Sequence, residues 1–155
     1  MTSEIKGGAN RVTYTSWSRF VRVRTTVGVV QRPMVVTRIH VGVETRDVLG
    51  LLDSGADNVS TPRNIADAFQ IPYDSDRTVR LDTSSGTASA NICAVRMEVL
   101  GFTEPSSPVS CEALIVPSSL DFILLGRSPW FEQYQIGFNG SSGGLLFAPS
   151  SPRGS

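Results

Sequence analysis

Val48-Leu49-Gly50-Leu51-Leu52-Asp53-Ser54-Gly55-Ala56 is the stretch of sequence that decides the fold of this chain. Its first five residues are apolar and predict a buried strand. The strand runs directly into a carboxylate, a hydroxyl and a glycine. Asp, Ser and Gly are also ordinary turn residues, so this stretch alone is equally typical of a turn. The residues further along the chain favour a functional site over a simple turn.

A second apolar strand, Ile123-Leu124-Leu125, ends in Gly126-Arg127, 70 residues after Asp53. Because glycine has no side chain, Gly126 can pass close behind the loop that follows Leu52. Alone, this segment is equally typical of a core strand followed by a turn. Its distance from Asp53 and its place in the chain favour a position next to the Asp53 loop.

A polar segment, Asp82-Thr83-Ser84-Ser85-Gly86-Thr87-Ala88-Ser89, lies between these two elements. Strands expected at 78–81 and 90–100 flank it, so it is interpreted as a long hairpin tip. It lies at the position where a mobile cover over the site would be expected. An ordinary hairpin explains the same residues. Asp82-Thr83-Ser84 imitates a second Asp-Ser-Gly motif but lacks the glycine, and it is rejected as a second site.

Short strands dominate the rest of the chain and predict an all-β barrel or sandwich. A first helix is expected at 62–69, with Thr61 capping its free amides and Pro62 at its first position. A second begins at Ser128-Pro129 and covers 130–134. Residues 1–16 are expected to form a flexible arm, 17–149 the domain and 150–155 a disordered tail. Strands are expected at 20–30, 35–41, 46–52, 111–116, 122–125, 135–139 and 144–148.

The charge of the chain argues against a nucleic-acid partner. It has 155 residues with 14 Lys and Arg against 14 Asp and Glu, and phosphate binding needs clustered cations. Arg19, Arg22 and Arg24 alternate with apolar residues, which predicts one solvated face of a strand. No segment is apolar and long enough to span a membrane, so no membrane contact is expected from this segment. The compartment is not readable from the sequence.

The chain offers few metal ligands or thiol nucleophiles. Cys93 and Cys111 are far apart in apolar strands, so they are expected to be buried free thiols, with a single bridge left open. His40 is the one histidine and lies in a strand, which is poor support for Ser-His or Cys-His chemistry. No metal and no cofactor is expected.

Taken together, these motifs resemble the retropepsin-like aspartic proteases over most of the chain. The Ile136-Gly137-Phe138-Asn139 and Gly144-Leu145-Leu146-Phe147 segments are more similar to cellular and bacterial members than to the compact viral enzymes. The resemblance implies an all-β fold: a closed β-barrel or sandwich, equivalent to half of a pepsin, with one or two short helices.

The resemblance also implies residue roles. Asp53 would be the catalytic aspartate, and Ser54 would bond across a dimer axis. Gly55 and Ala56 would contact substrate through their backbone. Asp57 would form a partly buried ion pair with Arg127, beside Gly126. The flap, which would cover the substrate, consists of Thr83, Ser84, Ser85, Gly86 and Thr87.

Two departures from the family pattern concern Ser128 and the flap. Many members have Asp or Asn after the Gly-Arg motif, where this chain has Ser128. The flap also lacks the glycine-rich tip of viral members. Subsite preferences therefore do not carry over from the family.

One Asp-Ser-Gly motif in a chain of this length implies a homodimer, with one Asp53 from each chain. Two close carboxylates share a proton, so one can activate water while the other polarises the peptide carbonyl. Candidate interface strands are 17–27 and 144–148, whose unpaired edges a dimer would cover, unless these strands pair within one chain. The expected function is an aspartic endopeptidase acting on extended peptides. The alternatives are an inactive dimerisation or peptide-binding module of this fold, and an unrelated barrel in which Asp53-Ser54-Gly55 is only a turn.

Overall fold

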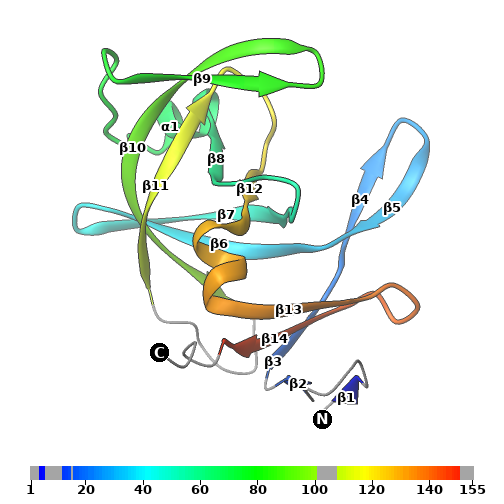
Figure 1. The fold of residues 1–155 in the computed structure, drawn as a ribbon. Coiled ribbons are helices and arrows are strands. Elements are labelled where there is room, and N and C mark those ends of the chain that lie inside the picture. The colour runs from blue at the N-terminus through cyan, green and yellow to red at the C-terminus, as the bar shows by residue number, and fades with distance from the viewer. Residues whose placement is uncertain (1–3, 6–11, 15, 101–107, 151–155) are drawn as a thin grey trace.

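The computed structural model describes residues 4–5, 12–14, 16–100 and 108–150, and strands dominate this part of the chain (Figure 1). Two short helical segments accompany them, as expected for an all-β fold. The elements are β1 (Glu4–Ile5), β2 (Val12–Thr13), β3 (Ser16–Arg19), β4 (Val21–Thr25), β5 (Gly28–Arg32), β6 (Met34–Val41), β7 (Glu44–Leu52), β8 (Val59–Pro62), α1 (Arg63–Ala68), β9 (Thr78–Thr83), β10 (Gly86–Leu100), β11 (Val109–Val116), β12 (Ile123–Leu125), η1 (Arg127–Phe131), β13 (Tyr134–Asn139) and β14 (Gly144–Pro149).

Six strands close into a barrel, which confirms the predicted architecture. They follow one another in the order β11-β8-β12-β7-β6-β10, and β10 pairs back onto β11. β9 extends the sheet beyond β10 as an edge strand. Most pairs are antiparallel, but β12 lies parallel to β7 and β11 lies parallel to β8. Alternate residues of each strand point into the barrel, and most of these are apolar. Its fully buried side chains include Ile39, Val59, Met97, Ile115, Ile123, Leu125 and Trp130.

The segment expected to be one strand at 20–30 is instead a hairpin. β4 and β5 pair antiparallel, from Val21 opposite Arg32 to Thr25 opposite Gly28. The turn is possible because Gly28 takes a φ of 123°, a conformation that favours glycine. The alternation of the arginines is confirmed, since Arg19, Arg22 and Arg24 are all exposed.

The predicted start of the first helix is wrong in one respect. Thr61 does not cap α1; it lies in β8, which continues to Pro62 through parallel pairing with β11. Its side chain therefore points into the core, where Oγ1 has no hydrogen-bond partner among the described residues. Pro62 precedes the first helical residue and makes no side-chain cap.

The second helix begins where expected, but it is irregular. η1 starts at Arg127, and its backbone is extended at Ser128 (φ −98°, ψ 125°). Helical backbone continues to Gln133, and Tyr134, expected to end the helix, is the first residue of β13.

The tip between β9 and β10 is tighter than the eight-residue polar loop expected at 82–89. Both strands continue into that segment, and only Ser84 and Ser85 form the turn. The Thr83 hydroxyl closes the turn by donating a 2.8 Å hydrogen bond to the carbonyl of Gly86, whose φ is 128°.

The terminal strands form a separate three-stranded sheet with the order β13-β14-β3. β14 is its central strand, so the expectation that 144–148 offers an unpaired edge for a dimer is wrong. β3, at the start of the other candidate interface strand, pairs with β14 within the chain. The expected arm at 1–16 and tail at 150–155 lie largely outside the described residues.

Cys93 and Cys111 lie on the neighbouring strands β10 and β11, and both are free thiols, as the sequence favours. Burial raises the pKa of each thiol to about 11, so both are protonated at neutral pH. Within the described ranges, the helices are too short to cross a bilayer.

The buried hydroxyl of Thr61 leads to a stability prediction. Thr61→Val keeps the shape of the side chain and removes an unpaired polar atom, so the free energy of unfolding should be unchanged or rise by up to about 1 kcal/mol. A lost helix cap would instead lower it by about 0.5–2 kcal/mol. Urea unfolding of both proteins measures the difference.

Thr61→Ala serves as the control for this comparison. It also removes the buried methyl group, so it should be less stable than Thr61→Val. Equal losses in the Val and Ala variants would show that the hydroxyl does stabilise the start of α1.

Candidate active site

Asp53 directly follows the last residue of β7, and backbone hydrogen bonds fix it there. Its N–H donates to the carbonyl of Leu125 at 3.1 Å, extending the parallel pairing of β7 with β12 by one residue. On the other side, the N–H of Leu52 donates to the carbonyl of Pro33 at 3.0 Å. The start of the loop is therefore held between two strands that are distant in sequence.

The loop then folds around the Asp53 carboxylate. The N–H of Gly55 donates to Asp53 Oδ1 at 2.9 Å, and the N–H of Ala56 donates to the Asp53 carbonyl at 3.2 Å. A Cβ on Gly55 would lie 3.1 Å from Asp53 Oδ1, so glycine leaves room for this contact. Asp53 is half-buried, with its carboxylate oriented by the backbone of its own loop.

Gly126 passes directly behind this loop, as the sequence predicts. A Cβ at Gly126 would lie 2.3 Å from the carbonyl oxygen of Asn58 and 2.8 Å from that of Ala56. Real Cβ atoms do not approach backbone this closely. No residue with a side chain fits here unless the loop moves.

Two further hydrogen bonds join the loop to the start of η1. The N–H of Arg127 donates to the Ala56 carbonyl at 2.8 Å, and the N–H of Ser128 donates to the Asp57 carbonyl at 2.9 Å. Ser128 therefore contributes through its backbone, while its hydroxyl donates to Glu132 Oε2 at 3.3 Å.

The expected ion pair is present, because Arg127 Nη2 bonds to Asp57 Oδ1. The expectation that it is partly buried is wrong for the single chain. The side chains of Asp57 and Arg127 are 72% and 61% exposed, so water screens the pair. They border an open pocket of about 420 Å³. Asn58, Ser128, Phe131 and Glu132 complete its lining.

The other expected site residues are exposed. The Ser54 hydroxyl makes no hydrogen bond to any described residue. The flap residues Thr83 to Thr87 comprise the β9–β10 turn and the strand ends beside it, and they make no hydrogen bond to the Asp53 loop. Figure 1 shows this turn and the end of β7 pointing to the same side of the barrel.

The structure places further groups near the Asp53 loop that the sequence did not indicate. The carbonyls of Pro33 and Asn58 contact the site through the backbone, which leaves no sequence signal. The Arg32 guanidinium lies 5.8 Å from the centre of the Phe122 ring, just before β12. The sequence carries no signal for this contact, because the two residues lie far apart along the chain.

The described side chains include no group of three or more His, Cys, Asp or Glu that could hold a metal ion. The site offers the oriented carboxylate of Asp53 and the neighbouring, exposed hydroxyl of Ser54.

Comparison with solved structures identifies the fold. A retropepsin-like aspartic protease from Rickettsia conorii matches 85% of this chain and 98% of its own, with 16% sequence identity and a TM-score of 0.53. The simian foamy virus (mac) protease matches 64% of this chain and 96% of its own, with 24% identity and a TM-score of 0.43. No protein-family model matches the sequence, and a search of curated proteins finds no similar sequence.

The chain thus has the retropepsin-like fold, an all-β barrel shared with aspartic proteases. At these identities the likeness concerns the fold, and a fold alone does not establish an activity.

The close approach of Gly126 leads to a second prediction. Gly126→Ala should lower the free energy of unfolding by about 1–3 kcal/mol, because the new methyl group overlaps backbone rather than a flexible side chain. Chemical denaturation measures the loss, and backbone amide shifts of residues 53–58 report movement of the loop.

Gly140→Ala is a matched control, because a Cβ there meets nothing within 4 Å. It should leave both measurements nearly unchanged. A Gly126→Ala protein as stable as the Gly140→Ala protein, with unmoved loop shifts, would contradict the tight crossing.

Proposed function

We propose that this protein is an aspartic endopeptidase, active as a homodimer in which each chain contributes Asp53. The observation that carries the proposal is the fixation of Asp53 at the end of a buried strand. Its loop is bonded to Leu125 and lies against Gly126. A catalytic carboxylate must be held rigidly, and this arrangement supplies that rigidity.

The proposed reaction uses two carboxylates and one water molecule. When two Asp53 side chains lie close together, they cannot both ionise, so the pair holds one shared proton. The ionised carboxylate takes a proton from water, whose oxygen attacks the peptide carbonyl carbon, and it later gives that proton to the amide nitrogen as the C–N bond breaks. The protonated carboxylate donates a hydrogen bond to the carbonyl oxygen as charge develops there.

The exposure of the site in one chain supports a dimer. Ser54 has an unused hydroxyl, and the Asp57–Arg127 pair is open to water. A two-fold axis beside Asp53 would place the same exposed patch on both partners. Such an interface would cover these polar groups and bring the two carboxylates together.

The proposed substrate is an extended polypeptide between the Asp53 loop and the flap. β9 is an edge strand, so backbone amides and carbonyls along its free side are available to pair with an added strand. Recognition of this kind depends mainly on backbone hydrogen bonds, and it suits a peptide held straight across the site.

The carboxylate chemistry predicts that Asp53→Asn abolishes peptide cleavage, because a carboxamide can neither accept the shared proton nor deprotonate water. Cleavage of a peptide library should be measured from about pH 3 to 7 for both proteins. Asp76→Asn, which alters an exposed carboxylate away from the Asp53 loop, should retain activity.

Activity that survives Asp53→Asn would rule out the mechanism. A wild-type protein that dimerises but cleaves no peptide at any pH would favour an inactive binding module of this fold.

A shared site also predicts that specific activity falls on dilution, since only the dimer has both carboxylates. Specific activity and sedimentation should be measured over the same range of protein concentration, and the two should decline together. Full specific activity in a sample shown to be monomeric would contradict a shared site.

A further inference from the structure

The region from residue 16 to residue 33 has an unusual charge. It contains four arginines, Arg19, Arg22, Arg24 and Arg32, and no Asp or Glu. Ten Lys and Arg therefore remain against 14 Asp and Glu in the rest of this neutral chain. The positive charge is concentrated on β3, β4 and β5.

The β4–β5 hairpin displays part of this charge on one open face. Arg22 lies opposite Gln31 and Arg24 lies opposite Val29, and all four side chains are exposed. Neither arginine forms an ion pair with any residue that the structure describes. Val21, Val23 and Val30 are half-buried on the other face of the hairpin.

The base of the hairpin is joined to the candidate active site. Arg32, the last residue of β5, lies over the Phe122 ring, and the next residue, Pro33, accepts the hydrogen bond from Leu52.

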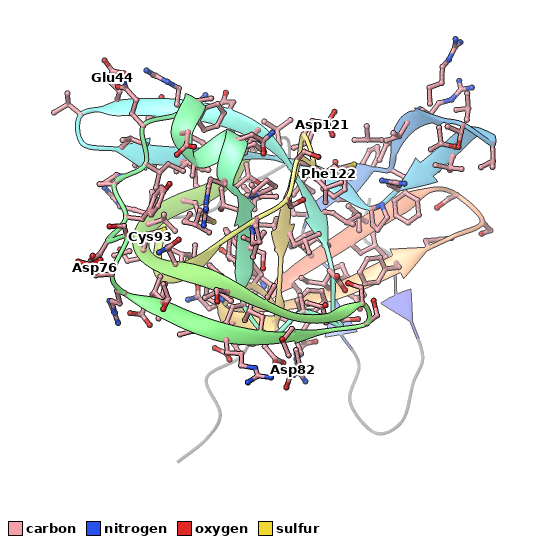
Figure 2. All side chains as sticks on the ribbon, turned by 90° about the horizontal axis from the view of Figure 1, so that it is seen from above. Glu44, Asp76, Asp82, Cys93, Asp121 and Phe122 are labelled. Carbon is pink, nitrogen blue, oxygen red and sulfur yellow. The ribbon has the colours of Figure 1, made fainter. Side chains whose placement is uncertain are left out.

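The other end of the hairpin is held by the terminal sheet, because the N–H of Phe20 donates to the Gly143 carbonyl at 2.6 Å. Figure 2 shows Phe122 at the edge of the barrel that faces the blue hairpin. In Figure 1, the hairpin projects beyond the barrel on the same side as the end of β7.

We propose that the Arg22 and Arg24 face of this hairpin binds an acidic stretch of the polypeptide substrate outside the cleft. The inference rests on the proposed peptidase function and adds a class of substrate to it. Guanidinium groups bind carboxylates with paired, charge-assisted hydrogen bonds. The hairpin lies on the side of the barrel where β7 ends, so a chain that extends from the Asp53 loop in that direction can reach it.

The properties of the hairpin favour a peptide over other occupants. A two-stranded hairpin alone is marginally stable, and Val27 and Val29 are 89% and 52% exposed, so apolar contact with a partner would stabilise it. Two guanidiniums interleaved with valine are few for a nucleic acid, whose binding draws on many phosphate contacts. A second copy of this face would bring like charges together.

The test compares two peptides with the same central sequence. One carries four Asp residues at each end, and the other carries four Asn residues at each end. Binding to the full-length Asp53→Asn protein is followed by fluorescence anisotropy. We expect the acidic peptide to bind about five- to tenfold more tightly, the value for two exposed ion pairs. This difference should disappear in Arg22→Gln/Arg24→Gln and at high salt.

Arg77→Gln/Arg96→Gln is the control, since it removes two exposed arginines outside the hairpin, Arg96 from β10 and Arg77 from the segment before β9, where it pairs with Glu112. It should keep the preference for the acidic peptide. In the catalytically intact protein, Arg22→Gln/Arg24→Gln should cleave the neutral peptide as the wild type does and show a higher KM for the acidic one only.

Equal affinity for both peptides, or equal loss in the two double variants, would overturn the proposal. So would tighter binding of a single-stranded RNA of the same charge, or a changed oligomeric state in Arg22→Gln/Arg24→Gln. Failure of the wild-type protein to cleave any peptide would instead reject the peptidase function, because the anisotropy measurement requires binding alone.

Discussion

The absence of a side chain at Gly126 is the constraint on which the candidate site depends. Because β12 can pass against the loop of residues 53–58, its last carbonyl reaches the N–H of Asp53, and the residues after it reach the carbonyls of Ala56 and Asp57. These contacts are all between backbone atoms. The loop therefore has a fixed shape that owes little to its own side chains, several of which face water. The side chains of Ser54, Asp57 and Arg127 accordingly remain exposed to solvent in the single chain.

Much of this arrangement is readable from the sequence because glycine and apolar runs are restrictive. A strand ending in Asp-Ser-Gly and a second ending in Gly-Arg are each compatible with an ordinary turn, but their order and spacing together favour a shared site. The crossing at Gly126 is expected from those two segments, whereas the closed barrel and the contact between Asp57 and Arg127 are implied by the resemblance to the retropepsin-like proteases. The exposure of that ion pair follows from neither, since burial depends on what surrounds a pair rather than on its spacing.

The elements that sequence reasoning placed wrongly share a cause. In the segment 20–30, alternation continues through Thr25 and Val27, so the reversal is marked only by Gly28 and its positive φ. At Thr61, a cap and a strand end are equally good local choices, and parallel pairing of β8 with β11 selects the strand. At the β9–β10 turn, polar residues suggested a loop, yet exposed strands are polar on both faces. In each case the pairing partner of a strand decides the local structure, and that partner is the adjacent strand at the two hairpins and the distant strand β11 at Thr61.

The parallel pairing of β7 with β12 has a consequence for how the protein acquires its site. Asp53 emerges early during synthesis, but the strand that fixes it begins at Ile123. Until that strand has been made, the Asp53 loop has no hydrogen bond to Leu125 and no backbone behind it. Non-local pairing of this kind also forms slowly, because a long segment must first be ordered. An incomplete chain ending before β12 would therefore hold its carboxylate on an unsupported loop. The supported form of the Asp53 loop exists only after the chain has extended through β12.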